Sequence, residues 1–131
     1  MNFKVSTVTN AIGTPGSPAS LAVSTTATAS VTVHTNNVQD NNLGGGIGGA
    51  VIIGASVPTS NPTVQFSYSL DGTNFIPDDG PFVVPTATGT YPYRYSLADA
   101  PTEAVALQVS VTNGTGNAIT HWWQTVTLSM P

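Results

Sequence analysis

The sequence predicts an all-β fold, an antiparallel β-sandwich or jelly roll of about seven or eight strands. Apolar and polar residues alternate with a period of two along most of the chain, and no useful length of it carries an apolar stripe with helical spacing. Short strand-length runs are separated by Gly, Pro and Asn residues, which favour turns. The chain has no cysteine, so no Cys-Trp-Cys framework favours a true immunoglobulin domain.

A chain of 131 residues fits one domain. We assign residues 21–131 to a single β-sandwich domain and residues 1–20 to an N-terminal segment that precedes it. Within the N-terminal segment, Phe3–Thr9 has the pattern of an edge strand followed by a loop. The alternative is an arm that reaches a neighbouring molecule.

Leu21–Thr35 shows the clearest alternation, with a neutral polar outer face. As one strand it would span about 50 Å, which is longer than most single strands. We therefore expect a bend or bulge near Thr25–Thr28, or two consecutive strands that switch sheets.

The middle of the chain predicts a long loop and two strands. Asn36–Gly49 is rich in Asn and Gly and predicts a loop, whereas Ala50–Val57 predicts an apolar strand that ends at a proline. Thr63–Leu70 alternates again and predicts a strand, and Asp71–Asn74 has the composition of a turn.

Prolines divide the next part of the chain. Phe75–Ile76 predicts the start of a short strand that Pro77–Pro81 interrupts, and Phe82–Val84 predicts another short apolar piece. Thr90–Leu97 predicts a strand, and Pro92 within it indicates an edge strand or a bulge.

The C-terminal part predicts a closing hairpin. Asp99–Glu103 predicts a connector, and Val105–Val111 predicts a cleanly alternating strand. Asn113–Asn117 predicts a hairpin turn, so the last strand, Ile119–Met130, pairs most simply with Ala104–Thr112.

Charge is scarce: the chain has two basic and six acidic residues, 6% in all, where a typical soluble domain has about 25%. The net charge of −4 argues against nucleic acid and anionic membranes as partners, since both need clustered Lys or Arg. No run approaches the ~20 apolar residues of a membrane-spanning helix, and the first residues lack the apolar core of a signal peptide. We expect a surface that partners cover or that neutral hydroxyls and amides form.

One acidic region could bind a metal ion. Its carboxylate and amide side chains could offer oxygens to Ca²⁺: Asp71, Asn74, Asp78 and Asp79. The spacing does not match an EF-hand, and the same residue types form ordinary turns. A solvated turn is the favoured interpretation, and we predict neither a metal nor another cofactor.

The aromatic residues are candidates for a binding surface. Trp122 and Trp123 are adjacent, so in a strand they face opposite ways; one should lie in the core and the other should be exposed or covered by a partner. Tyr91, Tyr93 and Tyr95 form a stripe that could stack against sugars. The inner face of a sandwich is the favoured interpretation of that stripe.

The glycine run is a second interface candidate: Gly44, Gly45 and Gly46 with Ile47. It lacks the Lys-Ser/Thr ending of a phosphate-binding loop, so it predicts a flexible loop that orders on binding, or close backbone packing between subunits. The two histidines, His34 and His121, fall in predicted strands, where we expect them on the outer face. Neither belongs to a paired catalytic motif, and we predict no catalytic residue and no enzyme.

The chain resembles small virion proteins of tailed bacteriophages. The resemblance rests on the Thr/Ala/Ser/Val alternation of Ala19–Thr35, the phrase Phe66–Phe75 (FSYSLDGTNF) and closing strands rich in Thr and Val. It implies a capsid decoration or cement protein, often a homotrimer clamped across junctions of the major capsid protein, made in the host cytoplasm and located on the capsid surface. It carries over no functional residue.

Three hypotheses therefore stand. The first is a virion structural protein, most simply a cement or decoration protein and otherwise a head fibre or tail component. The second is a carbohydrate-binding or adhesin module that uses an exposed tryptophan, the tyrosine stripe and the Asp71–Asp79 loop. The third, an enzyme, is disfavoured because no motif brings titratable groups together.

Overall fold

The computed structural model describes residues 4–14, 16–32, 44–96, 99–101 and 103–129. This part of the chain contains nine strands: β1 (Lys4–Ile12), β2 (Ala19–Leu21), β3 (Thr26–Thr32), β4 (Gly44–Ile53), β5 (Thr63–Ser69), β6 (Phe75–Val83), β7 (Gly89–Ser96), β8 (Ala106–Thr112) and β9 (Ile119–Ser129). The all-β prediction is confirmed. None of the described residues belongs to a helix long and apolar enough to cross a membrane.

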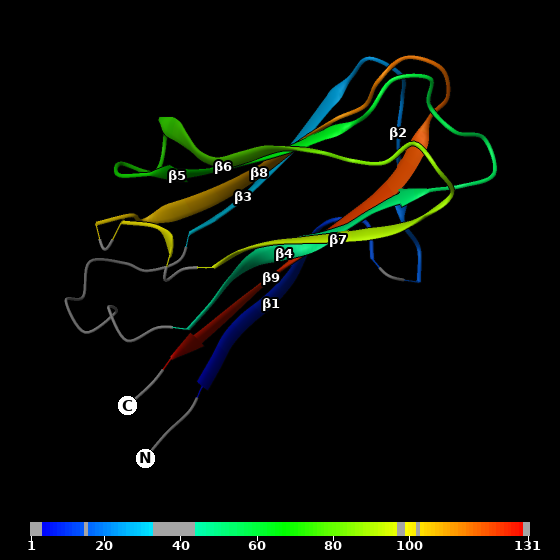
Figure 1. Cartoon of the computed structure of the whole chain (residues 1–131). Helices are drawn as coiled ribbons and strands as arrows, with labels where there is room; N and C mark the ends of the chain where they lie inside the picture. Colours follow the sequence, from blue (N-terminus) through cyan, green and yellow to red (C-terminus); the bar gives the residue numbers. More distant parts are fainter. Residues whose placement is uncertain (1–3, 15, 33–43, 97–98, 102, 130–131) are drawn as a thin grey trace.

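The strands form two antiparallel sheets that pack face to face (Figure 1). The first sheet has the order β1-β9-β4-β7, with β2 also paired to β9, and the second has the order β3-β8-β5-β6. Apart from β2, the pairs are nested: β1 with β9, β3 with β8, β4 with β7, and β5 with β6. A long hairpin rolled into two sheets has this nesting, so the sandwich is a jelly roll.

The alternation of Leu21–Thr35 is divided between the two sheets. β2 pairs with β9 in the first sheet, and β3 pairs with β8 in the second. Ser24, between them, has a φ of 54°, which turns the chain. The prediction of two consecutive strands that switch sheets is confirmed. Val23 lies in the turn between them and is 42% exposed, so the apolar side of the alternation is interrupted there.

The glycine run is a strand and not the predicted loop. Gly44–Ile53 forms β4, which lies between β9 and β7 in the middle of the first sheet. A Cβ atom on Gly49 would lie 2.7 Å from Trp123 Cα and 2.8 Å from its Cε3. The missing side chain therefore makes room for Trp123, and the close backbone packing predicted between subunits occurs within one chain. The predicted loop residues 36–43 lie outside the described residues.

Prolines do not interrupt β6 as predicted. β6 runs continuously from Phe75 to Val83 at the edge of the second sheet, with register irregularities against β5 and a cis bond before Pro81. An edge strand needs partners on one side only, so it tolerates prolines. β7 is likewise an edge strand, as Pro92 indicated, and β1 forms the opposite edge of the first sheet, as Phe3–Thr9 predicted.

The predicted closing hairpin is wrong. β8 belongs to the second sheet and β9 to the first, so residues 113–118 cross between the sheets. The Asn113 side chain is 3% exposed, and its Nδ2 donates to the carbonyl oxygens of Leu21 (3.1 Å), Ala22 (3.3 Å) and Asn117 (3.0 Å). One amide thus ties the crossover to the segment in which the chain changes sheets between β2 and β3.

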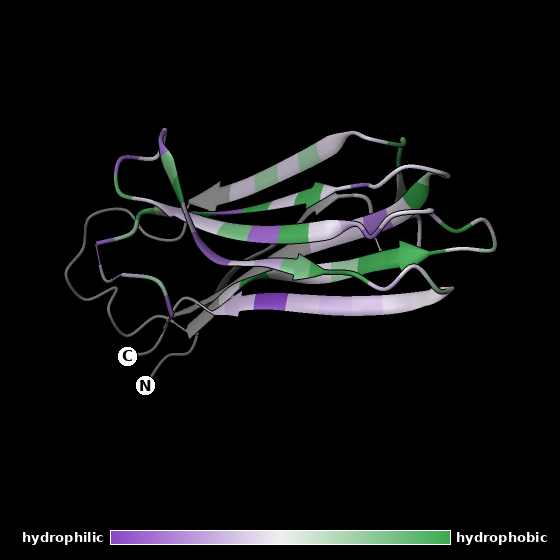
Figure 2. Ribbon diagram, turned by 45° about the horizontal axis from the view of Figure 1, so that its top comes forward, coloured by the Kyte–Doolittle hydropathy of each residue, from purple (hydrophilic) through white to green (hydrophobic). Residues whose placement is uncertain are grey.

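An aromatic cluster joins the sheets across the core. Phe66 of the second sheet stacks on Tyr95 at 5.6 Å between ring centroids and meets Trp123 edge-on at 6.1 Å. All three side chains are fully buried. Inward-facing aliphatic residues alternate with polar ones along the strands, visible as alternating bands in Figure 2. The jelly roll therefore has one closed apolar core.

Gly49→Ala is expected to destabilise the fold by about 1–3 kcal/mol, because the added methyl group overpacks the contact with Trp123. The measurement is urea unfolding followed by tryptophan fluorescence. The matched control is Gly54→Ala, whose Cβ atom meets nothing within 4 Å and which should change stability by less than about 1 kcal/mol. Equal stability of the two variants would contradict the packing role of Gly49.

Asn113→Ala is expected to cost about 1–3 kcal/mol, since it leaves buried carbonyl oxygens without a donor. Asn113→Asp should cost more, because a carboxylate would face the same oxygens. Asn117→Ala, which removes a single exposed bond to the Val57 carbonyl, serves as the control and should cost less. Thermal unfolding ranks the three variants, and an Asn113→Asp melting temperature equal to that of the parent would refute this role.

Candidate functional site

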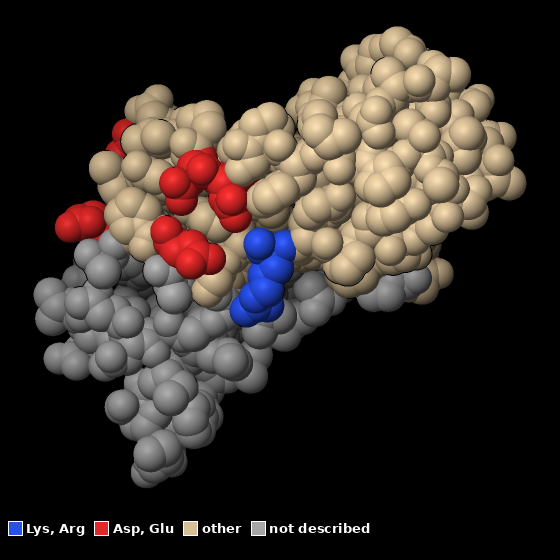
Figure 3. All heavy atoms as spheres, viewed as in Figure 1, with Lys and Arg blue, Asp and Glu red and all other residues tan. Residues whose placement is uncertain are grey.

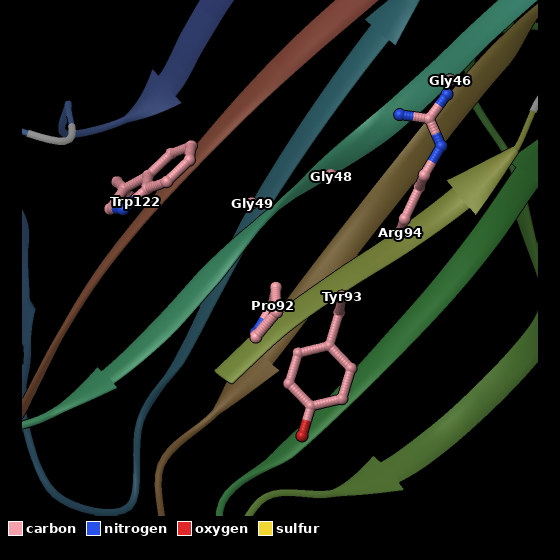
Figure 4. A pocket seen from close by; sticks show the side chains of 7 residues that line it. All are labelled: Gly46, Gly48, Gly49, Pro92, Tyr93, Arg94 and Trp122. Atoms are coloured by element: carbon pink, nitrogen blue, oxygen red, sulfur yellow. The ribbon is translucent and has the colours of Figure 1, made fainter. Parts of the chain in front are cut away.

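A shallow trough on the outer face of the first sheet is the clearest candidate site. Its volume is about 240 Å³, and its lining comes from three neighbouring strands: Gly46, Gly48 and Gly49 of β4, Pro92, Tyr93 and Arg94 of β7, and Trp122 of β9. We call these residues the glycine trough. Figure 4 shows Trp122 and Arg94 on opposite sides of β4, with Gly48 and Gly49 between them.

Strand register explains how the sequence builds the trough. Ala50 is paired with Trp122 on one side and with Pro92 on the other, and Gly48 is paired with Arg94. Directly paired residues in antiparallel strands point to the same face, so these side chains stand on the outer face together. Neighbouring strands lie about 4.8 Å apart, which places Trp122 and Pro92 about 10 Å apart across the glycine strand.

The two tryptophans face opposite ways, as predicted. Trp123 is fully buried in the core, whereas Trp122 is partly exposed and lines the trough. The sequence could not assign which one is exposed. The structure assigns it through register, since Trp123 lies on the same face of β9 as the buried Ile119.

Arg94 and Pro92 were not singled out as site residues from the sequence. The sequence pattern could have identified them. They alternate with the tyrosine stripe along β7, so they occupy the opposite, outer face of the strand. Arg94 is exposed and has no ion pair or hydrogen bond to any described residue. Its guanidinium is directed toward Gly46, across β4 from Trp122 (Figure 4).

The tyrosine stripe faces the core, which was the favoured interpretation of its sequence pattern. Tyr95 is fully buried, Tyr91 and Tyr93 are half-buried against the core, and the Tyr93 ring lies 5.7 Å from that of Phe82. Burial raises the pKa of the Tyr95 hydroxyl well above its usual range, and its 2.6 Å hydrogen bond to Asp78 Oδ2 adds to the shift. The stripe therefore offers no open stacking platform.

The predicted metal candidates are dispersed. Asp71 Oδ1 accepts hydrogen bonds from the backbone N–H groups of Asn74 and Thr73, both at 2.8 Å, which hold the pKa of this carboxyl far below its usual range. Asn74 Nδ2 donates to Asp71 Oδ2 at 2.7 Å, so both oxygens close the turn. Asp78 binds Tyr95 instead, and Asp79 lies further along β6. Among the described residues no three His, Asp or Glu side chains gather as a metal site would require.

The glycine candidates divide along β4. Gly46 lines the trough, whereas Ile47 points into the core and is fully buried. Gly44 and Gly45 continue β4 opposite Leu128 and Thr127 of β9. The sequence therefore identified part of the trough floor but placed it in a loop.

His121 lies in the core, which corrects the expectation of an outer-face position. It is 1% exposed, and neither ring nitrogen has a hydrogen-bond partner among the residues that the structure describes. Burial lowers the pKa of this imidazole, so it is neutral at pH 7. His34, the other histidine, lies outside the described residues.

Comparison with protein families, with curated proteins and with solved structures finds no match for this chain. The glycine trough is therefore interpreted from its own geometry.

Stability is expected to fall as the pH drops below about 6.5, the usual pKa of an unfolded histidine. His121 has a lowered pKa in the folded state, so the unfolded state binds a proton at a higher pH than the folded state does. Acid therefore stabilises the unfolded state relative to the folded state. The loss should approach 1.4 kcal/mol per pH unit until the pH reaches the folded pKa. Urea unfolding between pH 5 and 7 measures it, and His121→Leu should flatten the slope. An unchanged slope in that variant would refute the assignment to His121.

Proposed function

We propose that this protein is a non-enzymatic structural component of a tailed-phage virion, a capsid cement or decoration protein that oligomerises and bridges capsid subunits. The observation that carries the proposal is the segregation of charge along the jelly roll. At one end, the loops 22–25, 54–62, 84–88 and 113–118 contain no charged residue. We call this the neutral end.

The opposite end is acidic. The β5–β6 turn carries Asp71, and the connector before β8 carries Asp99 and Glu103. On the face shown in Figure 3, the charged side chains gather over one part of the described surface, and the other described side chains of that face are uncharged. A neutral surface can be buried against a partner without the cost of several kcal/mol that each stranded charge adds.

Hydrogen bonds hold the loops of the neutral end together. Thr59 and Thr115 are joined by their hydroxyls at 2.9 Å and by the Thr59 N–H bond to the Thr115 carbonyl. Asn61 donates to the Val84 carbonyl at 2.9 Å, which links a third loop. Because these loops are already fixed, docking costs less conformational entropy.

The outer face of the second sheet supports oligomerisation. Three rows of neutral polar side chains cross β3, β8 and β5: Thr26, Thr112 and Thr63; Thr28, Ser110 and Gln65; Ser30, Gln108 and Ser67. We call these the hydroxyl face. Among the described residues β3 has a strand partner on one side only, and it carries neither charge nor proline to block a further strand. A second copy can therefore pair along this edge.

Stabilisation of a shell follows from linkage. A protein that binds the assembled shell and not its separated subunits stabilises the shell by RT ln(1 + [L]/Kd), about 2.7 kcal/mol at a hundred times Kd. Catalysis plays no part in this mechanism.

The test combines the purified chain with empty shells assembled from the major capsid protein of the same genome. The chain should co-sediment with the shells and raise their disassembly temperature, and light scattering during size-exclusion chromatography should show a trimer that EDTA leaves intact. A chain that stays in the supernatant would refute the cement role, and a monomer would refute the trimer.

Paired variants test the neutral end as the docking surface. Ser56→Glu places a charge on an exposed position of this end and should weaken co-sedimentation at least tenfold. Leu70→Glu places the same charge on the acidic end, where Leu70 is 51% exposed, and should leave binding unchanged. Equal binding by both variants would exclude the neutral end.

A further inference from the structure

Three features of the glycine trough meet at one place, and the capsid role uses none of them. An aromatic side chain, Trp122, stands on one side of β4. An exposed cation, Arg94, stands on the other side, and the floor between them is backbone without side chains (Figure 4). The volume of about 240 Å³ lies below the roughly 300–1,000 Å³ of pockets for drug-sized ligands, so it has room for one small ring.

The floor excludes an added strand as the occupant. Gly46, Gly48 and Gly49 are each paired with β7 on one side and with β9 on the other. Their backbone hydrogen-bonding groups are therefore directed within the sheet, and an extended peptide cannot pair with them from above. A ligand of this trough makes contact through surface packing and through the flanking side chains.

Trp122 and Pro92 supply the surface packing. They flank Ala50 in one row across the sheet and present flat apolar surfaces to solvent. A partly exposed indole packs well against another ring and gains from removing both surfaces from water. The C–H face of a pyranose sugar is such a ring surface.

Arg94 supplies the polar recognition. Its guanidinium has no ion pair or hydrogen bond to the described residues, and it is one of only two basic residues in the chain. The planar donor fork of arginine matches a carboxylate with two parallel hydrogen bonds. An arginine that no described residue pairs, across β4 from a stacking surface, therefore favours a ring that carries a carboxylate.

We infer that the glycine trough binds a carboxylated pyranose, the uronic acid unit of an acidic glycan. The sugar ring lies against Trp122 and Pro92 above Gly48 and Gly49, and its carboxylate binds Arg94. This site is independent of the proposed capsid role, because it lies on the outer face of the first sheet, away from the neutral end and the hydroxyl face.

The test uses two probes that differ at one carbon, methyl β-glucuronoside and methyl β-glucoside, titrated into the full chain by calorimetry. The glucuronoside should bind at least ten times more tightly. Arg94→Gln should remove that preference, and Arg94→Lys should retain part of it, since a lysine keeps the charge but loses the fork. Thr90→Ala, an exposed position on the same strand, is the control and should change neither affinity.

Trp122 tests the stacking contact. Trp122→Ala should abolish binding of both sugars, and Trp122→Phe should restore a measurable affinity. Circular dichroism checks that each variant is folded; if Trp122→Ala is unfolded, the Arg94 series and Trp122→Phe decide the question.

Three results would overturn the inference. The first is no binding of the glucuronoside at millimolar concentration. The second is equal affinity for the two sugars. The third is binding of a short peptide with a free C-terminal carboxylate as tightly as the glucuronoside, which would show that the trough recognises the charge and not the ring.

Discussion

The fit of Trp123 beneath Gly49 is the constraint on which the rest of the structure depends. β4 lies in the middle of the first sheet, and the backbone of Gly49 leaves no room for a side chain above the indole. Trp123 can then reach Phe66 of the second sheet, which in turn stacks on Tyr95. One absent side chain thus allows three aromatic rings to join the sheets. On the opposite face of β4, Gly46 and Gly48 leave the floor of the trough without side chains.

The strands that alternate locally were predictable from sequence. β5 and β8 follow the period-two pattern. Pro92 indicated an edge strand or a bulge for β7, and the structure has the edge strand. The strand at the glycine run was not predictable, because glycine has little strand preference and only the long-range contact with Trp123 explains it. The partner of β9 was also mispredicted, since nested pairing joins distant segments and the local turn at Asn113 favours a hairpin.

The candidate site shows the same limit. Trp122 was identified because adjacent residues of a strand face opposite ways, so one of the two tryptophans had to face outward. Arg94 and Pro92 line the same trough as Trp122 only because β4 pairs in register with both β7 and β9. The inward direction of the tyrosine stripe was predictable because strand interiors favour aromatic residues. The buried position of His121 was not, because a polar residue in an alternating strand suggests the solvent face.

The nested strand pairs have a consequence for the order of folding. β9 pairs with β1, β2 and β4. It is the last strand to be synthesised, so none of these three pairs can form before the end of the chain is made. Most contacts therefore span long stretches of chain, a topology in which loop closure slows folding. On the ribosome, the first sheet cannot close until β9 has emerged. Until then β1 and β2 have no strand partner and β4 can pair only with β7, so chaperones can protect these open edges from aggregation.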